Sequence, residues 1–168
     1  DLKKLPEGLQ EYYAGYWARW REEDDKWYDL YLPVLTTLAA AQEPCALDRI
    51  LDWARIESNE GERRRLRKLL NEEWRPFLAI SNDGMEEKYR FYHATVREFF
   101  EGKAEQNRAL AVESYRLNEL SQATKKRHKL IAERYLDLWG GLDKGLPYLV
   151  NKRDDDNVYG LRHLAAHL

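Results

Sequence analysis

A single β-hairpin signal, set in a chain whose other patterns are helical, limits the folds that this sequence can adopt. Pro76 opens a change of period: residues 77–81 fit a strand, the turn signal Asn82-Asp83-Gly84 follows, and residues 89–92 fit the returning strand. Helix, helix, helix, hairpin is the element order of a winged helix, a helix-turn-helix extended by a β wing. We therefore predict a mainly α fold: a winged helix of three to four helices plus one β-hairpin, followed by a small helical domain.

The first two helices are predicted from apolar stripes at helical spacing. After Pro6, which suits a first helical turn, an unusually aromatic stripe consists of Leu9, Tyr12, Tyr13, Tyr16, Trp17 and Trp20. A second stripe runs from Trp27 to Leu38 with Pro33 inside it, so either this helix kinks or a new helix begins at Pro33. Both stripes need a partner surface, and we expect buried positions for Trp17, Trp20, Trp27 and Phe99.

Two further helices precede the hairpin. The third spans residues 47–54 and follows Ala46, a poor capping residue. The fourth, after the loop at residues 57–61, turns its apolar residues Leu66, Leu69, Leu70 and Trp74 inward. The chain has only nine glycines and five prolines in 168 residues, which agrees with a largely helical fold.

The part after the hairpin has weaker signals. Residues 95–98 fit a capping box, in which Thr95 caps a short helix that Gly102 ends. Residues 103–127 are polar and are predicted as helix, residues 128–139 form a clearer helix, residues 151–157 fit a charged loop, and a last helix begins near Leu161. We divide the chain into a connecting helix plus winged helix at 1–102 and a helical domain at 103–168.

Composition excludes several classes of protein. The single cysteine, Cys45, leaves no internal disulfide framework and no cysteine-based zinc site, and we place it in a turn at residues 43–46. No apolar run approaches the roughly 20 residues of a membrane span. The glycines form no phosphate-binding loop and no serine lies in a nucleophile elbow, so we predict that this chain alone is not an enzyme. The chain starts at Asp1, and we expect it to be a piece of a longer, cytoplasmic protein.

Two polar clusters resemble metal sites only superficially. His163 and His167 are four residues apart, but the zincin pattern needs a glutamate where Leu164 stands, so we interpret them as surface or packing histidines. Asp154-Asp155-Asp156 lacks the spacing of a calcium loop, and we predict no metal site there.

The fourth helix offers a candidate contact surface for DNA or for a protein partner: Arg64, Arg65, Arg67 and Lys68. Between residues 60 and 75, however, six basic residues face four acidic ones, and the whole chain has a net charge of −2. A tight DNA complex neutralises roughly 6–10 phosphates. Glu86 and Glu87 also place acids on the wing tip. A DNA-binding winged-helix domain of a transcription regulator is therefore the alternative interpretation, and a purely structural helical adaptor is a third.

Residues 89–100 (YRFYHATVREFF) resemble the histidine-containing segment that ends the winged helix of NACHT-type proteins, which belong to the STAND class of signalling NTPases. Residues 5–13 resemble the helix that joins the NTPase lid to that winged helix, and residues 35–51 resemble its first two helices. Residues 159–164 are similar to the entry to a repeat array, often TPR or WD40 in bacterial members. Val96, where the family has an aromatic residue, departs from the pattern.

This resemblance implies a regulatory fragment of a STAND-class, NACHT-like NTPase that lacks the NTPase domain itself. Its winged helix would help to hold the ADP-bound closed state and relay activation to oligomerisation. His93 matches the family histidine that contacts the nucleotide phosphate, so ADP or ATP would bind in the full-length parent and no cofactor in the fragment. The implied partners are the NTPase domain of the same chain, further copies of the activated protein and C-terminal sensor repeats.

Overall fold

The computed structural model describes residues 7–22, 24–100, 114–149 and 154–168. Its longer helices are α1 (Glu7–Glu22), α3 (Leu32–Ala40), α4 (Leu47–Ala54), α5 (Glu60–Lys68), α6 (Ala94–Phe100), α7 (Ser114–Leu138) and α8 (Asp155–His167). Its strands are β1 (Cys45–Ala46), β2 (Leu78–Asn82) and β3 (Glu87–Phe91). The short helical turns are α2 (Asp24–Lys26), η1 (Trp27–Tyr31), η2 (Leu69–Glu73), η3 (Arg75–Phe77) and η5 (Leu142–Lys144). The fold is thus mainly helical, as predicted.

The three strands form one small antiparallel sheet in the order β1-β3-β2. The predicted hairpin is confirmed: β2 pairs with β3 from Leu78 opposite Phe91 to Asn82 opposite Glu87. The placement of Cys45 in a turn is wrong, because Cys45 lies opposite Tyr89 in a third strand. A two-residue strand has no period that a sequence could display. The order α3, β1, α4, α5, β2, β3 is that of a winged helix.

Pro33 is accommodated by a wide helical turn rather than by a sharp break. A proline inside an α-helix lacks the N–H for one hydrogen bond and clashes with the carbonyl group four residues earlier. Here the π-helical turn η1 comes just before α3, and the Leu32 N–H donates to the Trp27 carbonyl oxygen. Pro33 therefore occupies the first turn of α3, where its missing N–H costs nothing.

The aromatic side chains form the centre of one continuous hydrophobic core. Trp17, Trp20, Trp27 and Phe99 are all buried, which confirms the sequence prediction. Trp20 of α1 lies 5.1 Å from Trp74 and 5.2 Å from Phe77 between ring centroids, so the first helix packs on the winged helix. Of the stripe on α1, the side chains of residues 9–13 lie outside the described residues.

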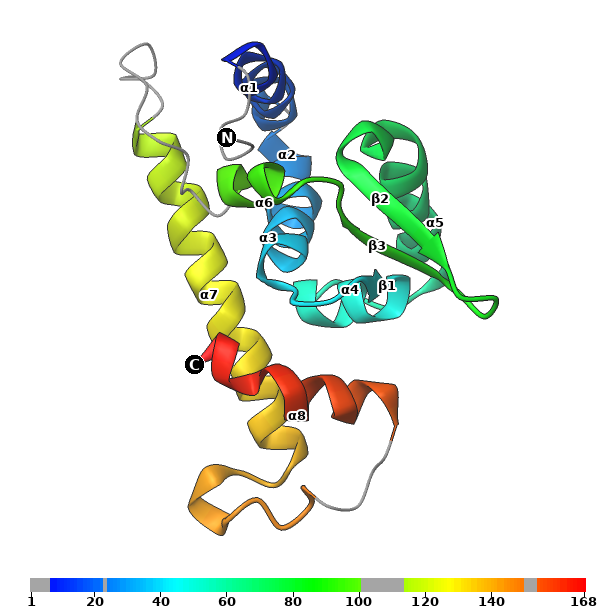
Figure 1. The fold of residues 1–168 in the computed structure, drawn as a ribbon, viewed down its shortest axis with the longest axis vertical. Helices are drawn as coiled ribbons and strands as arrows, with labels where there is room; N and C mark the ends of the chain where they lie inside the picture. The colour runs from blue at the N-terminus through cyan, green and yellow to red at the C-terminus, as the bar shows by residue number, and fades with distance from the viewer. Residues whose placement is uncertain (1–6, 23, 101–113, 150–153) are drawn as a thin grey trace.

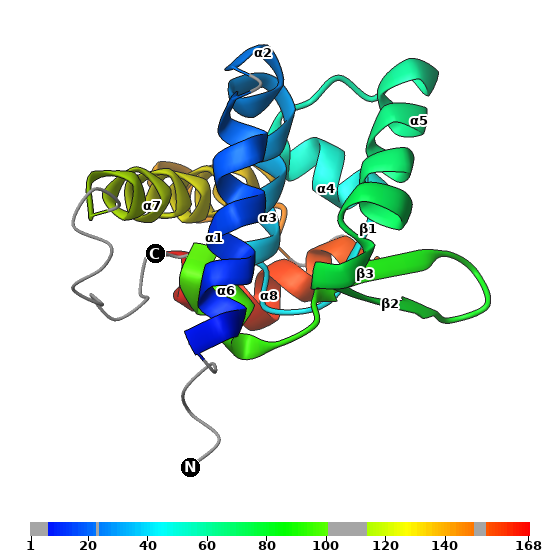
Figure 2. The ribbon, with the colours of Figure 1, turned by 90° about the horizontal axis from the view of Figure 1, so that it is seen from above.

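The C-terminal helices pack against the same core. In Figures 1 and 2, α7 runs along one side of the molecule, α5 and the wing lie on the opposite side, and α3 lies between them. Trp53 of α4 lies 6.3 Å from Tyr135 of α7 and 4.7 Å from Tyr159 of α8, between ring centroids. The proposed division at residue 102 stays a prediction, because it lies outside the described residues.

The helix predicted with a weak signal from residue 103 is described from Ser114, where α7 begins, and continues without a break to Leu138. Residues 103–113 lie outside the described residues. The charged loop predicted to reach residue 157 is wrong, because α8 already begins at Asp155. The Asp154 side chain accepts a 2.7 Å hydrogen bond from the Asn157 N–H and so caps the helix earlier than its apolar residues indicate.

Gly160 gives a test of the contact between α7 and α8. A Cβ atom at Gly160 would lie 2.7 Å from Cε1 of Tyr135 and 2.9 Å from Cζ2 of Trp139. Both neighbours are buried rings that have little room to move. We predict that Gly160→Ala lowers the free energy of unfolding by about 1–3 kcal/mol, the usual cost of overpacking.

The matched control is Gly15→Ala in α1, where an added Cβ meets nothing within 4 Å. Alanine is favoured over glycine in a helix by about 1 kcal/mol, so this variant should be neutral or slightly more stable. Chemical denaturation of both variants measures the difference. A Gly160→Ala protein as stable as the Gly15→Ala protein would contradict the close approach.

Candidate functional site

His93 lies between the end of β3 and the start of α6, on the rim of a pocket of 270 Å³. The segment between α3 and β1, the end of β3 and α6 together form this His93 pocket, whose polar and aromatic lining includes Gln42, Glu43, Arg90, Tyr92, His93 and Arg97. The pocket therefore gathers residues that are about 50 positions apart in the sequence around one exposed imidazole.

One nitrogen of the His93 ring is fixed by its neighbour. Nδ1 lies 2.8 Å from Oγ1 of Thr95 and accepts a 3.4 Å hydrogen bond from the Thr95 backbone N–H. Because Nδ1 accepts, the proton of the neutral ring lies on Nε2. No described residue hydrogen-bonds to Nε2, so its N–H can donate to a bound group.

The capping role predicted for Thr95 is wrong. Helix α6 begins at Ala94, and the Val96 N–H donates to the His93 carbonyl oxygen at 3.1 Å. Thr95 thus lies inside the first turn of α6. Its backbone N–H donates a hydrogen bond to the imidazole of His93, which acts as a capping oxygen would. Sequence rules for capping list Ser, Thr, Asp and Asn, so a histidine in this position escapes them.

The cationic residues of the His93 pocket favour an anion. Arg90 and Arg97 line it from β3 and α6. Its carboxylate, Glu43, already has partners: it lies 2.7 Å from Nε2 of His163 and 3.5 Å from Arg162. The hydrogen bond from His163, more than the nearby charges, lowers the pKa of Glu43. The arginines and the Nε2 proton of His93 could together hold a phosphate or carboxylate.

The second predicted surface lies on α5, away from this pocket. Arg64, Arg65, Arg67 and Lys68 are exposed there, and of these four only Arg65 has an ion-pair partner among the described residues, Glu62 at 3.6 Å. Arg63 instead binds Asp48 of α4 at 2.5 Å and so fixes α5 to α4.

The wing beside α5 is acidic, as its sequence predicts. Glu86 and Glu87 are exposed, and Lys88 is paired with Asp83 at 2.7 Å. The hydrogen bond from Lys88, followed by those from the Met85 and Glu86 backbone N–H groups, lowers the pKa of Asp83 to about 2. The positive face of α5 therefore does not continue over the wing, which weakens the case for DNA binding.

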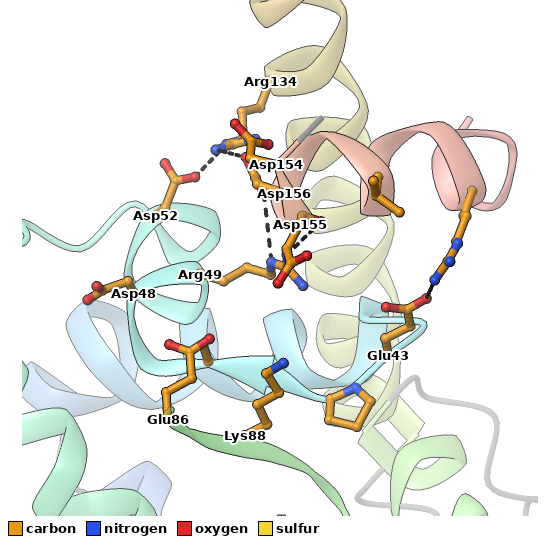
Figure 3. A pocket seen from close by; sticks show the side chains of 14 residues that line it. Glu43, Asp48, Arg49, Asp52, Glu86, Lys88, Arg134, Asp154, Asp155 and Asp156 are labelled. Carbon is orange, nitrogen blue, oxygen red and sulfur yellow. Dashed lines mark hydrogen bonds and ion pairs between the residues drawn. The ribbon is translucent and has the colours of Figure 1, made fainter. Parts of the chain in front are cut away.

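A second pocket, of 710 Å³, lies where α4, β3, α7 and α8 meet (Figure 3). Four of its side chains are paired with one another: Arg134 of α7 binds both Asp52 of α4 and Asp156 of α8, the latter at 2.7 Å, and Arg49 of α4 also faces Asp156 at 3.7 Å. Asp156 further accepts a 2.8 Å hydrogen bond from the Tyr135 hydroxyl. We call Arg49, Asp52, Arg134 and Asp156 together the polar junction. We interpret it as a connection between the winged helix and the C-terminal helices.

The remaining sequence candidates have structural partners. His163 contacts Glu43, and His167 is buried against Tyr159 and His128. Over residues 7–22, 24–100, 114–149 and 154–168, no group of three or more His, Cys, Asp or Glu side chains is placed to hold a metal ion. Burial raises the pKa of Cys45 to about 12, so its thiol is a poor nucleophile at neutral pH.

Sequence reasoning missed the residues that join the winged helix to α7 and α8. Arg49, Asp52 and Arg134 belong to the polar junction, but in the sequence they look like ordinary surface charges. No local spacing marks such pairs, because the paired residues are between about 20 and 110 positions apart in the sequence. Only the folded arrangement brings them together.

Comparisons with known proteins give no relative. No protein-family model matches the chain, and it matches neither a curated protein nor a solved structure. None of the described helices is both long enough and apolar enough to cross a lipid bilayer.

Two adjacent aspartates test the polar junction. Asp156 is bound to Arg134 and Tyr135, whereas the neighbouring Asp155 is exposed and has no side-chain ion pair among the described residues. Hydrogen bonds to charged groups contribute about 1.5–3 kcal/mol, and partial exposure reduces this value. We predict that Asp156→Asn lowers the free energy of unfolding by about 1–2 kcal/mol more than Asp155→Asn does.

Because both aspartates lie in the first turn of α8, the loss of a favourable helix-dipole charge is shared by the two variants. Urea denaturation at low and high salt measures the difference, which should shrink in high salt because ions screen the pair. Equal midpoints in low salt would show that the junction contributes nothing to stability.

Proposed function

We propose that this chain is the regulatory winged-helix part of a larger STAND-class, NACHT-like signalling NTPase. In this proposal the winged helix closes over an ADP-loaded NTPase domain of the same chain, and its release lets the activated protein oligomerise. Sensor repeats would follow the C-terminal helices, in a cytoplasmic protein. The proposal rests on the sequence resemblance of residues 89–100 together with the winged-helix element order.

The observation that carries the proposal is the state of His93. Its Nδ1 is held by Thr95, and its Nε2 proton has no hydrogen-bond partner among the described residues. A donor in this state can meet a phosphate oxygen of a nucleotide bound to a neighbouring domain. Arg90 and Arg97, in the same pocket, favour the negative charge of that phosphate.

The test uses a protein that contains both this chain and the NTPase domain. A hydrogen bond to a charged group is worth roughly 1.5–3 kcal/mol, so we predict that His93→Ala releases ADP at least about tenfold faster. Basal activity or oligomerisation without the signal should rise. Stopped-flow release of a fluorescent ADP analogue measures the rate.

Two variants control this experiment. His93→Gln, whose amide can still donate a hydrogen bond, should retain ADP better than His93→Ala. Met85→Ala changes the exposed wing tip and should leave release unchanged. Wild-type release in the His93→Ala protein would leave His93 as an ordinary wing residue.

The second candidate function is binding of duplex DNA, favoured by the exposed cations of α5. We predict no tight binding by this chain at moderate salt, because the wing is acidic and few phosphates could be neutralised. Fluorescence anisotropy with a labelled duplex measures the affinity over a salt series.

A sub-micromolar complex that weakens steeply with salt would reverse the ranking of the two functions. It should then be lost in the triple variant Arg64→Ala, Arg65→Ala, Arg67→Ala. The matched control removes three cations from α7, namely Lys125, Lys126 and Lys129. Equal losses in both triple variants would show a nonspecific charge effect.

A further inference from the structure

The C-terminal helix is held to its neighbours by a chain of hydrogen bonds that ends in two histidines. Nδ1 of His167 in α8 lies 2.8 Å from Nδ1 of His128 in α7. On its other side, Nε2 of His167 lies 3.0 Å from the Tyr159 hydroxyl, which accepts a 3.0 Å hydrogen bond from the Gln42 backbone N–H. His167 is only 3% exposed.

The contact between the two imidazoles limits the number of protons that they can hold. At 2.8 Å, one Nδ1 must carry a proton and the other must offer its lone pair. The docked pair can therefore accept one proton beyond the neutral state. A second added proton would place two N–H groups head to head and two positive charges on adjacent rings, whereas separated histidines can each take a proton near pH 6.5.

We propose that the His128–His167 contact is a pH-sensitive clasp that holds the C-terminal half of α8 on α7 in neutral solution and releases it in mildly acidic solution. The proposal of the clasp does not rest on the proposed nucleotide function, because His128 and His167 lie outside the His93 pocket. Release requires only that the separated imidazoles bind more protons than the docked pair.

The charged groups around His167 oppose its protonation. Besides His128 of α7, these are His163 one turn earlier in α8 and Arg97 of α6; the neighbouring ring from α4 is the uncharged Trp53. The carboxylate of Glu43 is engaged by His163. On its open side His128 shares a pocket with Lys125, Lys129 and Glu133, two cations and one acid.

The direction of the pH effect follows from these surroundings. Burial first, and then the positive charges of His128, His163 and Arg97, lower the pKa of His167 to about 4. A histidine with a lowered pKa stabilises the docked state above pH 6.5, and this stabilisation is lost as the pH falls from about 6.5 toward 4. One proton of difference predicts that the opening equilibrium constant of α8 rises about 20-fold between pH 7 and pH 5.

Hydrogen exchange at individual amides tests the clasp in this chain. Protection factors, which remove the intrinsic pH dependence of exchange, should fall about 20-fold for α8 between pH 7 and pH 5. Amides of α3, which lies in the centre of the core, should change less than α8. A uniform fall in α3 and α8 would indicate global unfolding and would overturn the proposal, as would unchanged protection in α8.

Two substitutions assign the effect to a residue. His167→Phe keeps the ring volume but cannot titrate, so the protection of α8 should vary less than about threefold over this pH range. His163→Gln, one turn earlier in α8, should retain at least about a tenfold change. A His167→Phe protein with the full wild-type pH response would overturn the proposal.

A measurement on the wild-type chain covers the case in which His167→Phe does not fold. The NMR signal of the His167 Cε1–H should remain that of a neutral ring at pH 5, while α8 is docked. Titration of this signal near pH 6.5 without loss of α8 protection would show that the docked site accepts the proton, and the clasp would then be wrong.

Discussion

The arrangement of the molecule depends on the docking of α7 against α3 and α4, and a buried cation fixes that docking. Arg127 is 9% exposed, and its guanidinium donates to the Trp53 carbonyl oxygen at 2.5 Å and to Oγ1 of Thr36 at 3.4 Å. Burial, and then the charge of Arg55, lower the pKa of Arg127 to about 10, so the group remains charged at neutral pH. Its counter-charge is the C-terminal end of α4, where the helix dipole is negative. A buried charge tolerates few other positions, which fixes how α7 lies on the winged helix.

Once α7 is fixed, the remaining C-terminal contacts follow from two sets of its side chains. The buried rings of Tyr135 and Trp139 form an aromatic surface that α8 approaches so closely that only glycine fits at position 160. Arg134 meets the aspartates of α4 and α8 in the polar junction. The apolar contact supplies most of the stabilisation, because its rings are buried, while the partly exposed ion pairs mainly select the orientation.

The difference between local patterns and long-range contacts explains which features the sequence predicts. The helices before the hairpin, the hairpin itself and the burial of Trp17, Trp20, Trp27 and Phe99 follow from local periodicity, and the structure confirms them. Strand β1 has two residues and depends on its pairing with β3, and α8 starts early because of a single capping side chain. The candidate site at His93 likewise combines a local motif with contacts that the sequence does not show. His93 stands out by its motif, but its fixed tautomer and its pocket depend on Thr95 and on a segment about 50 residues earlier.

The segment of Gln42 and Glu43 connects the two functional proposals physically. It forms one wall of the His93 pocket, and α8 holds it at both residues: the Tyr159 hydroxyl accepts from the Gln42 N–H, and His163 binds Glu43. Release of α8 would remove both contacts and leave the Glu43 carboxylate without its imidazole partner beside Arg90 and Arg97. An unpaired carboxylate in this pocket disfavours an anion, so docked α8 and a bound phosphate stabilise each other. Because such coupling is reciprocal, a phosphate in the His93 pocket would also lower the pH at which the clasp opens.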